Sequence, residues 1–457
     1  MTALRGAVVL AGEIATQLHC WLAMLRAAVR IAVHRGRLRF HGDAGSAVVE
    51  RRLIVISFYS PPYRSIYGTQ RVGKFIKFLG RLGWKITLVT SQPAPEDVDA
   101  GLEGISPGVE VIRLDPRVFV SPSLAGNSLA VPDRYVPWGL AAADAVKSVV
   151  ARQGPAIVLA TAPPYSNAIA ATLAAGTLRL PFVADFRDPW SKIDFYWTIR
   201  NSVLRGINRL LERGVLWSAS RVLTVVYPRF MHDYLDFPGA RAAGKVQTIL
   251  NGYDEEDFEG LAPSADLLLG NKFVISYVGS IYDAETLRLI TQPIRKWHAR
   301  HPDELSAVLF VYAGANGGEV TGARLPCATD VRGYLSHREA IRLRMSSHLQ
   351  LLALPAGFNR HIMTGKIFEI LRCGAPVLAR ADRSGGVAEL IGRTAGGFVV
   401  PQDDDDAAVE ILRRQFKAWQ SGERAPARDA DGIAHLSRER QAKDLSEILD
   451  QLVVSRP

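Results

Sequence analysis

Cysteine is scarce in this sequence, and its three copies, Cys20, Cys327 and Cys373, lie far apart without any C-x-x-C pair. This spacing excludes a zinc ribbon and a disulfide framework, and it fits a protein of a reducing cytoplasm. No run of about 18 uncharged apolar residues occurs, so no segment has the composition of a membrane-spanning helix. The apolar stretch at residues 7–34 also lacks the small-residue cleavage site of a secretion signal.

Two common nucleotide-binding motifs are missing as well. No G-x-G-x-x-G follows the first expected strand, and no G-x-x-x-x-G-K-[ST] occurs anywhere, which weighs against a nicotinamide-dependent enzyme and a P-loop nucleotidase. No recognition-helix, RNA-binding or zinc pattern is present, so a nucleic-acid partner has no support. The pairs Asp97/Asp99 and Asp429/Asp431 lie in polar, turn-rich stretches, and we therefore expect no metal.

The length and charge of the chain are informative in their own right. Its 457 residues, 48% of them hydrophobic, suffice for two α/β domains and exceed what one compact core holds. The formal net charge of +10 predicts attraction to an anionic partner, and a membrane surface and phosphorylated metabolites both qualify.

Two segments have the pattern of basic amphipathic helices. Residues 7–34 either pack on the body of the protein or lie on an anionic membrane surface, and the residues alone leave both readings open. With four arginines elsewhere, residues 199–216 place five apolar residues on an expected apolar face: Ile199, Val203, Ile207, Leu210 and Leu211. A core-facing helix is the simpler interpretation of the second segment, and a membrane-facing surface is the alternative.

From Leu53 onward, short apolar runs alternate with helix-patterned segments, as a doubly wound parallel sheet requires. The expected strands of the first half begin at Leu53, Lys85, Val109, Ala156, Phe182 and Arg221. Those of the second half are Phe273–Val278, Ala307–Tyr312, Leu349–Ala353, Pro376–Ala379 and Gly397–Val400. Because such sheets bind ligands beyond the carboxyl ends of their strands, the loops that follow several of these strands are expected to face one cleft.

Gly68 and Thr69 stand just before a helix-patterned segment in the first of these loops. Backbone N–H groups at a helix N-terminus can receive a phosphate, although a glycine in this place is also typical of a plain turn. We count both residues as candidate donor-binding residues.

The segment 364–379 is the most informative stretch of the sequence. Lys366 and Glu369 lie three residues apart, hence on one face of a short helix that ends at Gly374. A lysine in the first turn opposes the helix dipole, so a bound anion would explain it, and Glu369 can accept hydrogen bonds from two ribose hydroxyls. A surface salt bridge between the two is the simpler alternative.

At this point the chain resembles the family-4 glycosyltransferases of the GT-B fold, over roughly Leu53 to the C-terminus. Five stretches in the expected order carry the resemblance: 57–68, 184–190, 249–254, 333–337 and 364–369. The last helix-patterned segment is similar to the C-terminal helix that crosses back onto the first domain in this family.

The resemblance implies an α/β protein with two Rossmann-like parallel-sheet domains that face a central cleft, plus the N-terminal amphipathic helix. We expect an N-terminal helix and linker at 1–50, an acceptor domain at 51–258, and a nucleotide-sugar donor domain at 270–433. Residues 434–457 are expected to pack back on the acceptor domain.

Three positions depart from the pattern of the family. His361 stands where many relatives carry the first of two glutamates, and Glu369 matches the second. The stretch after the first strand of the second domain, which includes Ser280, has no basic residue, so we expect Lys366 to hold the diphosphate instead. Arg187 aligns with a histidine that contacts the donor sugar in many relatives. These departures resemble a branch that acts in bacterial surface-polysaccharide assembly.

The implied activity is transfer of a sugar from a nucleoside-diphosphate sugar to a lipid-linked or polysaccharide acceptor, with retention and without a metal or other cofactor. The expected location is cytoplasmic, on the inner face of the plasma membrane. A nucleotide-sugar epimerase of the same fold is the alternative. Arg187 and Asp185 are the expected catalytic residues. The expected donor-binding residues are Gly68, Thr69, Ser280, Tyr334, His361, Thr364, Gly365, Lys366, Ile367 and Glu369.

Overall fold

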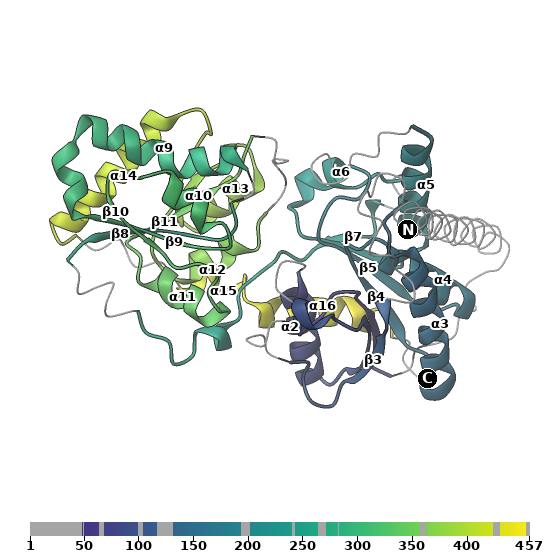
Figure 1. The fold of residues 1–457 in the computed structure, drawn as a ribbon. Coiled ribbons are helices and arrows are strands. Elements are labelled where there is room, and N and C mark those ends of the chain that lie inside the picture. The colour runs from purple at the N-terminus through teal and green to yellow at the C-terminus, as the bar shows by residue number, and fades with distance from the viewer. Residues whose placement is uncertain are drawn as a thin grey trace, which may run out of the picture. The chain divides into compact units, whose positions relative to one another are not determined.

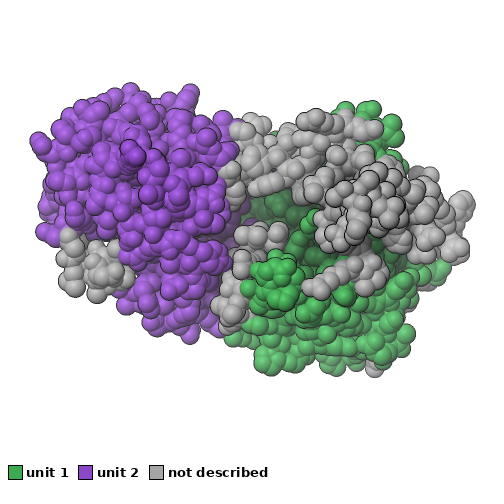
Figure 2. Space-filling model, viewed as in Figure 1, with its two compact units in different colours: residues 1–250, 442–457 green, residues 251–441 purple. Residues whose placement is uncertain are grey.

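The computed structural model describes residues 48, 50–63, 68–98, 104–116, 131–192, 202–239, 243–263, 271–281, 283–356, 361, 363–423 and 430–453. The chain divides into two compact units, coloured separately in Figure 2. Unit 1 comprises residues 1–250 and 442–457, and unit 2 comprises residues 251–441. The expected amphipathic helix at 7–34 lies outside the described residues. No helix in the described part of the chain is both long enough and apolar enough to cross a membrane.

Unit 1 is built on a parallel sheet with seven strands among its described residues, in the order β3-β2-β1-β4-β5-β6-β7. The strands are β1 (Arg52–Ile56), β2 (Lys85–Ser91), β3 (Glu110–Leu114), β4 (Ile157–Ala162), β5 (Phe182–Phe186), β6 (Arg221–Thr224) and β7 (Val246–Thr248). The central strands β1, β4 and β5 are buried and mostly apolar because helices cover both faces of the sheet.

Two layers of helices enclose this sheet (Figure 1). The helices are α2 (Thr69–Arg81), α3 (Val136–Gln153), α4 (Ser166–Leu178), α5 (Ser202–Ser218), the short α6 (Met231–Tyr234) and α16 (Arg438–Asp450). A core on one face joins α2 and the end of α16 to the sheet through Val72, Phe75, Leu445 and Leu449. The last turns of α16 therefore belong to the core of unit 1.

Unit 2 carries a second parallel sheet, with six strands among the described residues, in the order β10-β9-β8-β11-β12-β13. The strands are β8 (Phe273–Val278), β9 (Val308–Ala313), β10 (Ala328–Val331), β11 (Leu349–Ala353), β12 (Val377–Arg380) and β13 (Gly397–Val400). The helices are α9 (Ala284–Arg300), α10 (Gly317–Gly322), α11 (His337–Met345), α12 (Lys366–Arg372), α13 (Gly386–Arg393), α14 (Asp405–Gln420) and α15 (Ala430–Ala434).

The main core of unit 2 lies between the sheet and the helices α9 and α14. Ile294 and Trp297 of α9 pack there with Leu412 and Phe416 of α14. On the opposite face, Leu343 of α11 packs against Val274 and Val311. In Figure 1, α9 and α14 accordingly lie on one side of the sheet, with α11 and α12 on the other.

These two sheets confirm the expected α/β fold class with two Rossmann-like halves. The expected strands Phe273–Val278, Leu349–Ala353 and Gly397–Val400 match β8, β11 and β13 in both bounds. The strands β7 and β10 are not anticipated by the apolar pattern. Both are edge strands with three or four residues, and exposed or half-buried positions leave them no continuous apolar run.

The expected apolar face of α5 is wrong in part. Leu211 is buried as expected, but Val203 and Leu210 are 68% and 55% exposed. Leu204, which was not expected on that face, is buried together with two polar side chains, Asn208 and Glu212. Asn208 accepts a hydrogen bond from the Trp190 indole at 2.7 Å. Glu212 accepts from the backbone N–H groups of Ser191 and Asp236 at 3.1 and 3.0 Å. These bonds stabilise buried polar side chains on the inner face, and so the helix is rotated from the orientation that hydrophobicity predicts.

Candidate functional site

Lys366 reaches the carboxyl end of β8 in unit 2. A Cβ atom added at Gly279, the residue after that strand, would overlap the Nζ of Lys366, so the glycine leaves room for the ammonium. The same Nζ lies 6.0 Å from the centre of the Tyr277 ring. The structure therefore brings a cation of α12 to the strand end where the sequence itself has none.

The environment of Lys366 makes its charge costly. The pKa of the ammonium is lowered to about 8: burial is the largest cause, the nearby Arg344 guanidinium also lowers it, and Glu369 opposes the shift. Desolvation favours the neutral amine, and a second cation adds repulsion. Part of the side chain is still exposed, so a ligand can reach it. An anionic group at this place would stabilise the charged form.

Glu369 lies between two cationic or titratable groups of α11. Its Oε1 is 3.7 Å from Nε2 of His337, and its Oε2 is 4.0 Å from Nε of Arg344. The His337 ring in turn lies 3.3 Å from Asp257. Glu369 therefore faces His337 and Arg344 of α11 as well as Lys366 of its own helix. An isolated surface salt bridge would involve α12 alone.

A capping box fixes the start of α11. The Ser336 side chain accepts a hydrogen bond from the Glu339 backbone, and the Glu339 carboxylate accepts one from the Ser336 backbone. This arrangement satisfies two otherwise unpaired N–H groups of the first turn. Because the capping box fixes the first residue of α11, His337 and Arg344 project toward Glu369 from set positions on the helix.

Glycines line the strand ends of unit 2. A Cβ atom at Gly314, just after β9, would overlap the carbonyl oxygen of Gly279 and the hydroxyl of Tyr312. The N–H of Gly314 donates to the carbonyl of Gly333 at 2.7 Å, and Gly333 has φ of +64°. Only glycine fits this close approach of three strand ends without strain.

The other predicted donor-binding residues of unit 2 are distributed around this edge. Ser280 follows Gly279, and its carbonyl accepts a hydrogen bond from the Tyr277 hydroxyl at 3.1 Å. Tyr334 is 62% exposed, and His361 is buried with its carbonyl near Gly386. The remaining three precede or begin α12: Thr364 is half-buried, Gly365 is exposed, and Ile367 is fully buried in the core.

Arg187 occupies the corresponding edge of unit 1. A Cβ at Gly68, which has φ of +73°, would overlap the Arg187 guanidinium, and that group donates to the carbonyl of Pro163. Burial lowers the pKa of Arg187, and Asp188 opposes the shift. Thr69, the first residue of α2, is fully buried. A cation is thus held at the positive end of α2, a place that favours an anion.

Asp185 is held in a buried ion pair. The Arg71 guanidinium donates to its two oxygens at 3.1 and 2.8 Å, and Thr161 donates at 2.9 Å. Both charged side chains are almost fully buried. Arg71 also donates to the carbonyls of Ile249 and Leu250 at 3.0 and 2.9 Å. These contacts are those of a structural pair, and a direct catalytic role for Asp185 stays a prediction.

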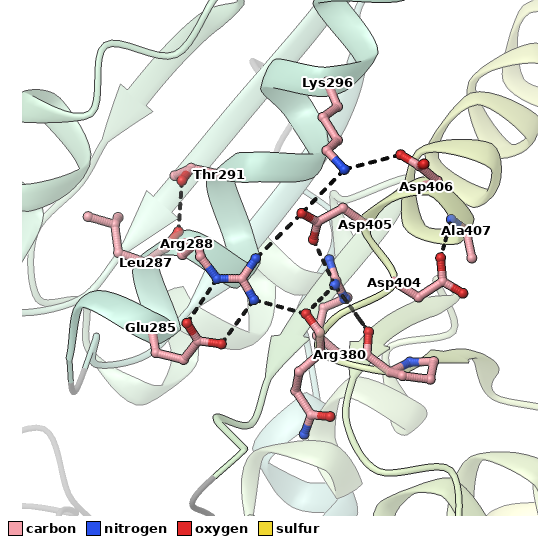
Figure 3. Close-up of polar contacts among 12 residues, drawn as sticks. Glu285, Leu287, Arg288, Thr291, Lys296, Arg380, Asp404, Asp405, Asp406 and Ala407 are labelled. Atoms are coloured by element: carbon pink, nitrogen blue, oxygen red, sulfur yellow. Dashed lines mark hydrogen bonds and ion pairs between the residues drawn. The ribbon is translucent and has the colours of Figure 1, made fainter.

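A charged network lies at the carboxyl end of β12, at the same edge of the unit 2 sheet (Figure 3). The buried Arg380 at the end of β12 donates to Asp405 at 2.8 Å and to the carbonyl of Gln402 at 2.8 Å. Arg288 and Lys296 of α9 approach the other oxygen of Asp405 at 3.4 and 3.7 Å. The network fixes the first turn of α14 to the strand ends. Its residues form a structural cluster rather than an open site.

Among the residues that the structure describes, no group of three or more His, Cys, Asp or Glu is arranged to hold a metal ion. The side chains at the two strand edges offer cations and hydrogen-bonding groups to a ligand. Lys366, Glu369, Arg344 and His337 are brought together in unit 2, and Arg187 and Gly68 in unit 1. The sequence did not predict that Arg71 and Arg344 are buried beside site residues, since an arginine in a helical pattern is usually solvated.

Comparison with known proteins agrees with this architecture. Residues 68–252 match the model of the family described as glycosyl transferase 4-like domain. No curated protein sequence matches the chain.

Several solved structures share the fold at low sequence identity. An α,α-trehalose-phosphate synthase (UDP-forming) from Burkholderia vietnamiensis has a TM-score of 0.59 at 13% identity, and the match covers 88% of this chain and 100% of that one. A structure described as trehalose-6-phosphate from E. coli bound with UDP-2-fluoro glucose has a TM-score of 0.60 at 13% identity, with 89% and 100% covered.

A putative UDP-N-acetylglucosamine 2-epimerase from Listeria monocytogenes is similar as well, with a TM-score of 0.55 at 12% identity over 88% of this chain and 96% of that one. At such identities these structures establish the fold and nothing finer. Together with the matched domain, the two parallel sheets identify the chain as an enzyme of the glycosyltransferase class with a GT-B fold.

Proposed function

We propose that this glycosyltransferase transfers a sugar from a nucleoside-diphosphate sugar to a lipid-linked or polysaccharide acceptor in bacterial surface-polysaccharide assembly, with retention and without a metal. The observation that carries the proposal is the position of Lys366. Its ammonium lies over Gly279 at the end of β8, and burial lowers its pKa to about 8. A diphosphate at this strand end would add negative charge beside the two cations, Lys366 and Arg344, which have only Glu369 between them.

Glu369 supports a nucleoside as the remainder of the donor. It lies on the same face of α12 as Lys366, and a carboxylate can accept two hydroxyl hydrogen bonds from a ribose. The structure from E. coli that shares the fold holds UDP-2-fluoro glucose. Stabilisation of the leaving diphosphate by Lys366 is the largest contribution that we assign to any residue, because charge develops there in the transition state.

Arg187 is our candidate for orienting the transferred sugar or the acceptor hydroxyl. It lies at the end of β5, and Gly68 gives its guanidinium room at the N-terminus of α2. A cation at the positive end of a helix is favoured only when an anion lies beside it. We propose Asp185 as the residue that holds this strand end in place beside Arg187.

We also propose that the protein works on the inner face of the plasma membrane as a peripheral protein. The exposed face of α5 supports this proposal because Val203 and Leu210 are exposed there beside Arg205, Arg209 and Arg213. Apolar side chains flanked by arginines suit the interface of an anionic membrane.

A thermal-shift panel with UDP-, GDP-, CMP- and dTDP-sugars tests the donor. One member is expected to raise the melting temperature, because a ligand that binds only the folded state stabilises it. Turnover of that donor, measured with and without a membrane-lipid extract, then distinguishes a transferase from a nucleotide-sugar epimerase. A transferase releases the nucleoside diphosphate only with the acceptor, whereas an epimerase converts the sugar nucleotide alone. A panel with no shift would contradict the proposal.

A further inference from the structure

Arg344 is a buried cation beside the proposed donor site, in which Lys366 and Glu369 contact the donor. It projects from the last turn of α11, and only 3% of its surface is exposed. Its Nη2 donates to the carbonyl of Val278, the last residue of β8, at 3.1 Å. Its Nε lies 4.0 Å from Glu369 and has no hydrogen-bond acceptor among the described residues. One guanidinium thus faces both the strand end and the carboxylate.

We propose that Arg344 is a positioning residue of the donor site. It fixes Val278 and Glu369 in place, and its charge leaves the surroundings of Lys366 with a surplus of positive charge. This inference rests on the proposed donor site and adds a residue to it. The planar guanidinium suits the task because its donors point in fixed directions, whereas a lysine offers one mobile ammonium.

Two charges act on the ammonium of Lys366: Arg344 of α11 repels it, and Glu369 of α12 attracts it. Its Nζ also lies 6.0 Å from the centre of the Tyr277 ring of β8, which is stacked on the Tyr312 ring of β9. His337 and Asp257 lie beyond Glu369. Two cations therefore share one nearby carboxylate, and a diphosphate would remove the imbalance.

The arrangement couples diphosphate binding to proton uptake. The pKa of Lys366 is lowered to about 8, first by burial and then by Arg344. A bound diphosphate favours the charged ammonium and raises this pKa, so affinity is highest below pH 8 and falls as the pH rises above it. Without Arg344 the unliganded pKa is higher, and the fall begins at a higher pH.

Calorimetry of UDP binding at pH 8.5, in two buffers that differ in ionisation enthalpy, measures this proton uptake. Wild-type protein is expected to take up roughly three quarters of a proton, since a group with a pKa of about 8 has lost that fraction at this pH. Arg344→Gln is expected to bind UDP roughly tenfold more weakly and to take up roughly a quarter of a proton. Arg344→Lys retains the charge and hence the uptake, but it loses affinity.

Arg342→Gln is the matched control, because Arg342 is an exposed arginine of the same helix, and it is expected to behave as wild type. Competitive acetylation of Lys366, read by mass spectrometry across pH, reports its pKa without any ligand. A midpoint near 8 in wild type and a higher one in Arg344→Gln support the inference.

The two proposals fail in different ways. Unchanged proton uptake and an unchanged acetylation midpoint in folded Arg344→Gln would overturn the role of Arg344 while UDP binding stands. Absence of UDP binding, with the acetylation midpoints as expected, would instead overturn the donor site and leave the local electrostatics intact. If Arg344→Gln does not fold, Arg344→Lys decides through its affinity: a wild-type value would contradict the positioning role.

Discussion

At the residue scale, Lys366 and Glu369 divide the recognition of a donor nucleotide between them. We expect Lys366→Ala to weaken binding of a nucleoside diphosphate more than binding of the nucleoside, because only the diphosphate contacts the ammonium. Glu369→Ala is expected to weaken both, since the ribose is common to them. Loss of a charge-assisted hydrogen bond costs about 1.5 to 3 kcal/mol, roughly tenfold to a hundredfold in affinity. Titration calorimetry measures both constants.

Arg383→Ala is the control for this experiment, because it removes one positive charge from an exposed turn of the same unit. It is expected to leave both affinities near the wild-type values. Unchanged affinities in Lys366→Ala and Glu369→Ala would mean that α12 does not form the donor site and that the pair is structural.

Arg187 is expected to affect turnover more than donor affinity. The side chain lies at the end of β5 in unit 1, while the nucleotide is assigned to unit 2. We expect Arg187→Ala to lower kcat by roughly tenfold or more, since it removes a charge-assisted contact made in the transition state. Arg187→Lys retains the charge and is expected to recover part of kcat. A variant with wild-type kcat and only a raised KM for the donor would show that the proposed role is wrong.

At the scale of elements, the pair Arg71–Asp185 fastens α2 to β5 and to the chain at Ile249 and Leu250. Removal of one partner leaves the other charge buried and unpaired, which typically costs about 3 to 5 kcal/mol. We therefore expect Asp185→Ala to lower the free energy of unfolding by about this amount and, through Arg187, to lower turnover. Denaturant unfolding of unit 1 measures the first effect.

Asp144→Ala is the matched control for Asp185→Ala, because Asp144 pairs with Lys147 on the surface of α3, where its side chain is 70% exposed. An exposed pair contributes about 0 to 1 kcal/mol. If Asp185→Ala kept wild-type stability and lost only turnover, Asp185 would act directly in catalysis, as the family resemblance implies.

A second prediction at this scale concerns the junction of β12 and α14. Asp405 accepts from the buried Arg380, so Asp405→Asn leaves that arginine without its counter-charge and is expected to cost about 3 to 5 kcal/mol. Asp406→Asn is the comparison, since Asp406 is 60% exposed and its pairs with Lys296 and Arg300 are on the surface. Thermal unfolding of the two variants separates the buried pair from the exposed ones. Equal melting temperatures would contradict the difference.

At the scale of the whole molecule, the basic charge and the exposed face of α5 lead to a prediction of membrane association. The full chain is expected to float with anionic vesicles at low salt and to be released as salt screens the attraction. Val203→Ser with Leu210→Ser is expected to weaken flotation, because the exposed apolar contact is lost without loss of charge. Recovery of the full chain in the soluble fraction at low salt would contradict the proposal.

Much of the fold follows from local pattern. Apolar runs such as Phe273–Val278 and Leu349–Ala353 become strands where expected, because a parallel sheet with both faces covered needs continuous apolar residues. The short edge strands β7 and β10 have no such run and could not be recognised. The expected apolar face of α5 is wrong at Val203 and Leu210, because buried Asn208 and Glu212 bond to groups distant in the sequence and turn those two residues outward.

The candidate site likewise has features that the sequence predicts and features that only the tertiary structure determines. The spacing of Lys366 and Glu369 already places them on one helix face, since three residues make nearly one turn, and the glycine after β8 is visible in the chain. Only the tertiary structure decides that Lys366 meets Gly279, that Arg344 is buried beside Glu369, and that Asp185 is paired with Arg71. Arg344 and Glu369 are 25 positions apart in the sequence, and Arg71 and Asp185 are 114 positions apart. Such contacts depend on how strands and helices pack, which no local sequence pattern encodes.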